Sequence, residues 1–286
     1  MEIRVCKKDS SSSCIILLGS NGAVGEVFYQ SIIKSNYSNY FINGADRFFS
    51  GHSNYVKAVD YILSQLPQSL DVQIIFCAGK GGFSLTSDSA SIQKLTFKSF
   101  CSSVLGRFKG RIIYVSSLGA ACSVIPSSYK DLVIYNEALI ANLFPDNSLI
   151  LRLPSLYGLK QETNKYYGLI GAILESLKKG SYTTVYSSMF TRRFYLSCDQ
   201  IGSQYLPALF HGCGGSELGI LNIMPHVSLS VFDVCQVFYK AIGRYPSLKI
   251  AETGFLPNKE SHFSTSLPGR IIRMTDSLPY WILRQW

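Results

Sequence analysis

The sequence has few charged residues and no long hydrophobic run. Only 16% of its 286 residues are Asp, Glu, Lys or Arg, against roughly 25% in an average globular domain. A membrane-spanning helix needs about 18 consecutive apolar residues, and no run comes close to that length. The apolar run Ile15–Leu18 is also too short for the core of a secretion signal. Because 47% of the residues are hydrophobic and 13% aromatic, we expect a compact globular protein with a large core.

The sequence also lacks the cysteine and histidine patterns of metal sites. None of the 8 cysteines sits in a CxxC pair, and none has a histidine partner at zinc-binding spacing. The 4 histidines show no mutual spacing that suits a metal ion or a catalytic triad. We therefore predict no metal site, and we expect reduced, mostly buried thiols in a cytoplasmic protein.

Basic residues exceed acidic residues but do not cluster. The chain has 27 Lys and Arg against 18 Asp and Glu, a formal net charge of +9, which favours anionic ligands. The longest basic run is a pair such as Lys178-Lys179, and no nucleic-acid-reading motif occurs. We therefore expect no nucleic-acid partner.

Short apolar runs alternate with helix-length segments through the first two thirds of the chain. The runs are CIILLG (14–19), NYFING (39–44), DVQIIFCAG (71–79), RIIYVSS (111–117) and SLILRL (148–153). This order predicts an α/β protein with a Rossmann-type, doubly wound parallel sheet that is buried on both faces. We interpret Ser10–Ser13 as a polar lead-in and Ile15–Leu18 as the first strand.

The pattern loosens after Pro154, where glycine and proline interrupt shorter segments. We therefore divide the chain into a sheet domain, residues 1–156, and a region that forms mainly a smaller C-terminal lobe, residues 157–286. Some segments of the second region are expected to return to the sheet domain.

The strongest local motif is the glycine loop Gly19-Ser-Asn-Gly22-Ala-Val-Gly25, between an apolar strand and a helix-like segment. Glycines there permit a tight turn and a close approach of the backbone to a pyrophosphate, and the following helix offers free N–H groups. The run 71–79 also ends in a glycine. The predicted NAD(P)-binding residues of these segments are Gly19, Asn21, Gly22, Ala23, Val24, Gly25, Ala78 and Gly79.

Two further residues bear on the choice of cofactor. In dinucleotide-binding domains an acid about 20 positions after the loop binds the adenosine ribose. Asp46 stands at about that distance, which favours NAD. Arg47 beside it suits a 2′-phosphate, which favours NADP. Both alternatives stay open.

Several further segments follow the glycine loop in order along nearly the whole chain. They are the strand end at Gly79, the serines of IIYVSS, LRLPSLYG (151–158), RRFYLSCD (192–199), and LNI (221–223) with VSLS (227–230). Together they resemble the extended short-chain dehydrogenase/reductase family, the NAD-dependent epimerases and dehydratases. The last three are similar to the family's segments LRPxxVYGP, RDFIYVDD and YNVG…vSi.

The resemblance implies a Rossmann domain that carries NAD or NADP and a lobe that binds a nucleotide sugar. In the family a tyrosinate removes a hydroxyl proton while a hydride leaves the same carbon, and a serine orients the substrate oxygen. Ser116 and Ser117 match the serine, and Tyr129, 13 residues after Ser116, matches the tyrosine. Arg192 matches the arginine that binds the substrate diphosphate, and Lys80 is a further candidate for substrate binding.

One family residue is missing. Val133 stands four residues after Tyr129, where the family has a lysine. In the family the ammonium of that lysine lowers the pKa of the tyrosine, which is about 10 for a free side chain. We favour an NAD(P)-dependent nucleotide-sugar epimerase, dehydratase or reductase with altered catalytic residues, in a polysaccharide pathway. The alternative is a catalytically degenerate NAD(P)-binding scaffold or redox sensor of the same fold. The resemblance also allows a homodimer.

Overall fold

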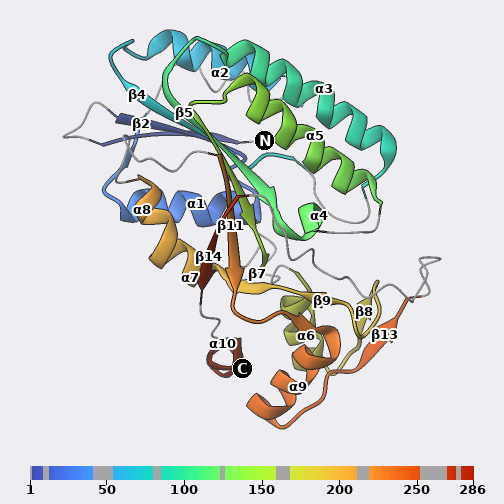
Figure 1. Ribbon diagram of the computed structural model, residues 1–286. Coiled ribbons are helices and arrows are strands. Elements are labelled where there is room, and N and C mark those ends of the chain that lie inside the picture. Colours follow the sequence, from blue (N-terminus) through green and yellow to red (C-terminus); the bar gives the residue numbers. More distant parts are fainter. Residues whose placement is uncertain are drawn as a thin grey trace.

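The centre of the protein is an eight-stranded sheet with the order β14-β11-β6-β5-β4-β2-β1-β3 (Figure 1). The computed structural model describes residues 2–8, 13–40, 54–79, 85–122, 126–158, 168–210, 219–251, 269–274 and 278–286. The strands are β1 (Ile3–Lys7), β2 (Ser13–Leu18), β3 (Ser38–Asn39), β4 (Asp71–Phe76), β5 (Lys109–Ser117), β6 (Ser148–Leu153), β11 (Gly219–Pro225) and β14 (Arg270–Met274). From β2 to β14 every neighbouring pair is parallel. The predicted doubly wound α/β fold is confirmed.

The N-terminal strand corrects one expectation from the sequence. β1 pairs antiparallel with β2, with Ile3 opposite Leu18, and it also pairs antiparallel with β3. The run Ile15–Leu18 therefore belongs to the second strand, and the sheet is not wholly parallel. Ile3 and Val5 pack into the core on one side of the sheet, and Arg4 between them points to the other. Such a short alternation, with charged residues in it, gives a weak signal in the sequence.

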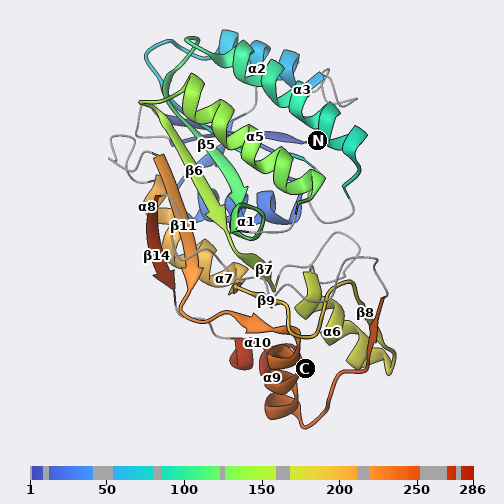
Figure 2. The same cartoon turned by 45° about the vertical axis from the view of Figure 1, so that its right-hand side comes forward.

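Helices cover both faces of the sheet (Figures 1 and 2). α1 and α8 lie on one face, whereas α2, α3 and α5 lie on the other. The helix bounds are α1 (Ala23–Lys34), α2 (Asn54–Gln65), α3 (Ser87–Val104), α4 (Leu118–Cys122), α5 (Ser128–Leu143), α7 (Cys198–Gln200), the π-helical turn η2 (Ile201–Tyr205) and α8 (Leu206–Phe210). β2 is buried along its whole length. Ile15 and Leu17 join the core under α1, while Ile16 and Leu18 join the core under α2, α3 and α5.

A smaller lobe lies beyond the carboxyl ends of β6 and β11 (Figure 2). Its elements are β7 (Ser155–Tyr157), α6 (Gly168–Lys179), β8 (Thr183–Val185), β9 (Arg192–Arg193), β10 (Tyr195–Ser197), β12 (Leu229–Ser230), α9 (Val231–Ile242), β13 (Leu248–Ile250) and α10 (Leu278–Gln285). Tyr157 and Trp281 meet edge to face in its core, with ring centroids 5.2 Å apart. The chain crosses between the two parts repeatedly, because β11 and β14 belong to the large sheet and α9 and α10 to the lobe.

Local hydrogen bonds set both ends of α9. Ser230 Oγ accepts from the N–H of Asp233 at 3.0 Å, and Asp233 Oδ2 accepts from the N–H of Ser230 at 2.8 Å. This reciprocal pair is a capping box. At the other end Gly243 takes φ of +70°, a left-handed conformation that favours glycine.

The helices α3 and α5 pack against each other and expose apolar side chains on the outside of the molecule. Ile92 and Leu95 on α3 are 62% and 67% exposed, and Ile134 on α5 is 44% exposed. In the part of the chain that the structure describes, no helix is both long and apolar enough to cross a membrane.

Candidate functional site

The glycine loop forms a tight turn at the carboxyl end of β2. The N–H of Gly22 donates to the carbonyl of Gly19 at 3.0 Å, and Gly19 has φ of +87°, which favours glycine. A Cβ on Gly25 would lie only 2.0 Å from the Gly19 oxygen. The first turn of α1 therefore packs directly on the loop, and no side chain fits between them.

The start of α1 is open to an anion. Gly22 is the N-cap residue and has no side chain to accept from the first helical amides. Because those N–H groups have no acceptor within the helix, and because the helix dipole is positive at this end, the position favours a negative group. Asn21 and Gly22 are exposed, and Ala23 and Val24 are half-buried. The loop therefore fits a pyrophosphate.

The end of β4 closes the other side of the same turn. The N–H of Cys77 donates to the carbonyl of Leu18 at 2.9 Å, and a Cβ on Gly19 would lie 2.9 Å from the Cα of Ala78. A Cβ on Gly79, whose φ is +130°, would lie 2.8 Å from Oε1 of Gln93. The structure thus brings together the predicted residues of the loop and of the β4 end, and their roles in cofactor binding stay predictions.

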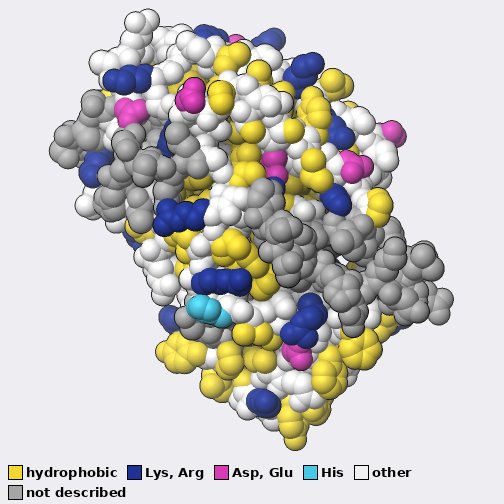
Figure 3. Space-filling view, in the orientation of Figure 1, with side chains coloured by type: hydrophobic (Ala, Val, Ile, Leu, Met, Phe, Trp, Pro, Cys, Tyr) yellow, Lys and Arg dark blue, Asp and Glu magenta, His cyan; other side chains and the backbone are white. Residues whose placement is uncertain are grey.

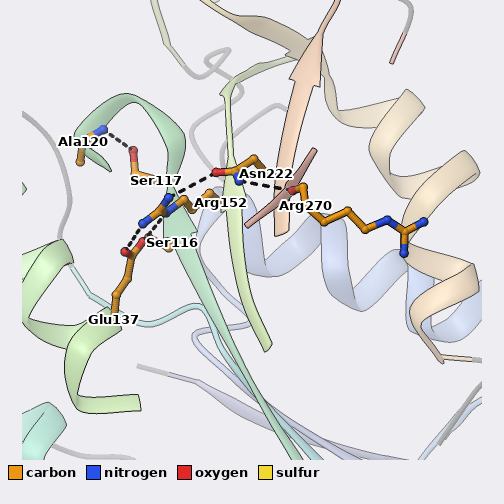
Figure 4. Close-up of polar contacts among 7 residues, drawn as sticks. All are labelled: Ser116, Ser117, Ala120, Glu137, Arg152, Asn222 and Arg270. Carbon is orange, nitrogen blue, oxygen red and sulfur yellow. Dashed lines mark hydrogen bonds and ion pairs between the residues drawn. The ribbon is translucent and has the colours of Figure 1, made fainter. Parts of the chain in front are cut away.

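Ser116, one of the two candidate serines, is buried, and its hydroxyl already donates a hydrogen bond within the protein. Its Oγ donates to Oε1 of Glu137 at 2.5 Å, and it is 7% exposed. The same carboxylate accepts from Arg152 Nε at 2.8 Å and from Arg152 Nη2 at 2.6 Å. Arg152 Nη1 also donates to Oδ1 of Asn222 at 3.4 Å. Figure 4 shows these side chains converging from α5, β5, β6 and β11.

Ser117, the second candidate, is more accessible. It is the last residue of β5 and is half-buried. Its Oγ accepts from the N–H of Ala120 at 3.3 Å (Figure 4). No hydrogen bond among the described residues uses its hydroxyl hydrogen. Of the two serines, Ser117 therefore fits better the role of donating to a substrate oxygen.

Tyr129 stands in the first turn of α5 and is half-buried. Ser127 caps this helix, because its Oγ accepts from the N–H of Lys130 at 3.1 Å. Burial raises the pKa of Tyr114 on β5, and the charge of Tyr129 acts in the same direction to a smaller extent. One turn after Tyr129, Val133 is only 3% exposed. An apolar, buried side chain fills the place of the family's lysine.

Arg192 folds back onto the start of α9. Its Nη2 donates to the carbonyl of Ser228 at 2.5 Å and its Nε donates to Ser228 Oγ at 3.1 Å. Its Nη1 lies 3.2 Å from Oδ2 of Asp233. Hydrogen bonding from Ser230 is the main cause of the lowered pKa of Asp233, and the charge of Arg192 adds to it. The side chain is still 48% exposed, so diphosphate binding by Arg192 stays a prediction.

Three candidate residues lie outside the described part of the chain. They are Asp46, Arg47 and Lys80. Their predicted roles, and with them the sequence-based alternatives of NAD and NADP, stay predictions.

Sequence reasoning did not find the buried network around Arg152 and Asn222. Arg152 is 6% exposed in a buried, mostly apolar strand, and Asn222 is fully buried. A buried guanidinium requires a charged or strongly polar partner. The arginine inside the run SLILRL was therefore a signal for such a partner, although it did not say which carboxylate.

The comparisons with known proteins find a likeness in structure alone. No family model and no curated protein matches the sequence. A solved NAD-dependent NDP-hexosamine 5,6-dehydratase involved in tunicamycin biosynthesis superposes with a TM-score of 0.67 at 14% identity, over 94% of this chain and 95% of the other.

Two further solved structures show the same likeness. UDP-glucose 4-epimerase from Thermotoga maritima, solved with UDP-glucose, has a TM-score of 0.65 at 14% identity, over 86% of this chain and 88% of its own. dTDP-4-dehydrorhamnose reductase from Bacillus anthracis, solved with NADP, has a TM-score of 0.65 at 15% identity, over 93% and 95%. The chain therefore has the Rossmann fold of nucleotide-sugar epimerases, dehydratases and reductases, and the resemblance drawn from its sequence is confirmed at the level of the fold.

Proposed function

We propose that this protein is an NAD(P)-dependent enzyme that acts on a nucleotide sugar by hydride transfer at a carbinol or keto carbon, as an epimerase, dehydratase or reductase. The observation that carries the proposal is the cradle formed by Gly19, Gly25 and Ala78 at the start of α1. Its backbone approaches too closely for side chains and leaves helix N–H groups free for a pyrophosphate.

Each role in the proposed reaction is assigned to a residue of this chain. The amides at Ala23 and Val24 hold the cofactor's pyrophosphate. Ser117 donates to the substrate oxygen, and Tyr129 removes the hydroxyl proton. NAD or NADP supplies a hydride acceptor when it is bound. The buried contact of Ser116 with Glu137 ties the end of β5, which carries Ser117, to the middle of α5, the helix whose first turn carries Tyr129.

The substrate is proposed to be an anionic nucleotide sugar. The net charge of +9 supports an anion. Figure 3 shows Lys and Arg side chains across the middle of one face, where the sheet meets the lobe. Arg192, with Lys80 as a sequence-based candidate, would bind the diphosphate. Arg192 would have to share or exchange its bonds to Ser228 and Asp233 to do so.

A second candidate function rests on Val133. A tyrosine of ordinary pKa, about 10, stays protonated at neutral pH and is then not available as a base. The position four residues after Tyr129, where the family has its lysine, holds a buried valine. The alternative is therefore a scaffold or redox sensor that binds NAD(P) without turnover. Cofactor binding together with the absence of turnover on UDP- and dTDP-hexoses would favour this alternative.

The test of the proposed function is cofactor binding with a pair of matched variants. Gly22 has φ of −80° and ψ of 157°, which any residue adopts, and both Asp and Asn are good N-cap residues. Gly22→Asp places a negative charge at the pyrophosphate position, whereas Gly22→Asn has almost the same shape without the charge. We expect NADH or NADPH, followed by cofactor fluorescence, to bind about 10-fold or more weakly to the Asp variant than to the Asn variant.

A lack of cofactor binding by the wild type would contradict the proposed function. If it binds neither reduced cofactor by fluorescence nor either oxidised cofactor by thermal shift, dinucleotide chemistry is excluded. Saturable binding is followed by incubation with UDP- and dTDP-hexoses and by chromatography of the products.

We also propose a homodimer formed through α3 and α5. The support is the exposure of Ile92, Leu95 and Ile134 on these adjacent helices, because exposed apolar patches mark interaction sites. Leu95→Glu is expected to convert the dimer into a monomer in light scattering after size exclusion. Leu283→Glu, at a 57% exposed site on α10, is the control and should leave the mass unchanged. A monomeric wild type would contradict the proposal.

A cytoplasmic location remains part of the proposal. Its support is the state of the six described cysteines with described side chains, all of which are free thiols. They are Cys6, Cys14, Cys77, Cys101, Cys198 and Cys235. A polysaccharide pathway and the absence of a nucleic-acid partner stay predictions from the sequence.

A further inference from the structure

Glu2 lies directly against the glycine loop. Its backbone carbonyl accepts from the N–H of Gly19 at 2.9 Å and from the N–H of Ser20 at 3.3 Å. This contact follows from the direction of β1, because an antiparallel neighbour brings its amino end to the carboxyl end of β2, with Ile3 opposite Leu18. The N-terminal segment is therefore part of the edge at which the proposed cofactor site lies.

β1 also changes which strand stands beside that site. In a doubly wound sheet, the strand that follows the first helix lies next to the first strand, and its carboxyl end carries the acid for the adenosine ribose. Here the strand that follows α1 is β3 (Ser38–Asn39), and β1 lies between β2 and β3. Since neighbouring strands are about 4.8 Å apart, β3 is one strand further from the glycine loop than in the usual order.

We infer that Glu2, from this inserted strand, is the acid that binds the adenosine ribose hydroxyls, and that it selects NAD over NADP. The inference rests on the proposed function and adds to it the residue that determines cofactor choice. The Glu2 side chain is 42% exposed, so it is accessible to a ligand. One oxygen, Oε1, accepts from Arg4 Nε at 2.7 Å, and no described residue donates to Oε2.

Arg4 holds this carboxylate in place. Its guanidinium carbon lies 3.8 Å from the centroid of the Tyr29 ring on α1, in a cation–π contact. Glu2 and Arg4 therefore lie on the α1 side of the sheet, the side on which the glycine loop leads into its helix. A 2′-phosphate would meet the negative charge of Glu2, whereas ribose hydroxyls can donate to it.

The test compares the affinities of NADH and NADPH for the full chain with a C-terminal purification tag, so that the residues before Glu2 stay unaltered. Glu2→Gln keeps the backbone carbonyl that receives the loop amides but removes the charge and releases Arg4 for a phosphate. We expect NADH to bind about 10- to 100-fold more weakly, as for the loss of charge-assisted hydrogen bonds, and the preference for NADH over NADPH to fall or reverse.

Two further variants complete the test, one as a control and one for the competing acid. Asp60→Asn breaks a carboxylate–arginine pair of equal length, 2.7 Å from Asp60 Oδ1 to Arg107 Nη1, on α2 at the other face of the sheet. It should leave both affinities unchanged. Asp46→Asn tests the competing acid that the sequence suggests, and it should have a smaller effect on NADH than Glu2→Gln. Thermal melts check that all three variants fold.

The outcomes separate this inference from the proposed function. Wild-type binding of NADH that Glu2→Gln leaves intact, or that only Asp46→Asn weakens, overturns the role of Glu2 while the proposed function stands. A wild-type preference for NADPH also overturns it, because a carboxylate at the ribose repels the 2′-phosphate. If the wild type binds no dinucleotide at all, both the role of Glu2 and the proposed function fail.

Discussion

The hydroxyl of Ser116 lies 2.5 Å from Oε1 of Glu137, in a carboxylate that Arg152 also binds through two nitrogens. The pair of Glu137 and Arg152 is almost fully buried, with side-chain exposures of 8% and 7%. A buried pair of this kind is sensitive to the loss of one partner, because the other charge is left without compensation. The contact therefore ties β5, β6 and α5 together under the residues proposed to act on substrate.

Removing the charge of Glu137 should destabilise the fold. We expect Glu137→Gln to lower the free energy of unfolding by about 3–5 kcal/mol, since Arg152 stays charged and buried. Urea unfolding followed by circular dichroism measures the change. Glu175→Gln is the control, because Glu175 pairs with the 61% exposed Lys179 at 3.3 Å and such a pair contributes about 0.3–0.5 kcal/mol. Equal effects of the two variants would contradict the structural role of Glu137.

The two neighbouring serines should respond differently to replacement by alanine. Ser117→Ala is expected to reduce turnover about 100-fold by removing a donor to the substrate oxygen, with little change in stability. Ser116→Ala should instead lower the free energy of unfolding by about 1–3 kcal/mol, because the buried Glu137 loses a hydrogen bond. Turnover and Tm are measured on both variants. The reverse pattern would assign the orienting role to Ser116.

An ammonium at position 133 should increase the fraction of Tyr129 that is ionised at neutral pH and can act as the base. An opposite charge within about 4–6 Å lowers the pKa of an acid by about 1–3 units, so Val133→Lys is expected to raise turnover at neutral pH by about 10-fold or more. Val133→Met controls for side-chain size at this buried position. The gain should vanish when Tyr129→Phe is added, since no proton is then removed. A gain that persists in the double variant would show that Tyr129 is not the base.

Alkaline pH should destabilise the protein through its buried thiols. Burial raises the pKa from an ordinary value of 9.0 to about 11 for Cys6 and about 12 for Cys101. Below the ordinary value both the folded and the unfolded states keep the proton, and the contribution of the thiol to stability is complete. Between the ordinary and the raised pKa only the unfolded state ionises, so stability falls by about 1.4 kcal/mol per pH unit for each thiol.

The measurement is the free energy of unfolding as a function of pH from 8 to 11. Cys101→Ala is expected to be less stable at every pH, because it leaves a cavity, but its stability should fall less steeply with rising pH. Parallel curves for the variant and the wild type would show that Cys101 does not contribute to the alkaline loss.

The sequence alone determined the parts of the site that depend on near neighbours in the chain. The glycine loop was predictable because Gly22 and Gly25 both approach the carbonyl of Gly19, only a few residues away in the chain. The alternation of apolar runs and helices was predictable because parallel strands are buried on both faces, and β2 is buried throughout.

Only the tertiary structure decided which distant residues meet. Ser116, Glu137, Arg152 and Asn222 come from four separate elements, and the spacing along the chain does not say which carboxylate faces which guanidinium. The place of β1 is a similar case. The two-residue period of a strand tells which side chains share a face, but the hydrogen bonds that bring Glu2 to Gly19 form between segments and leave no pattern in either of them.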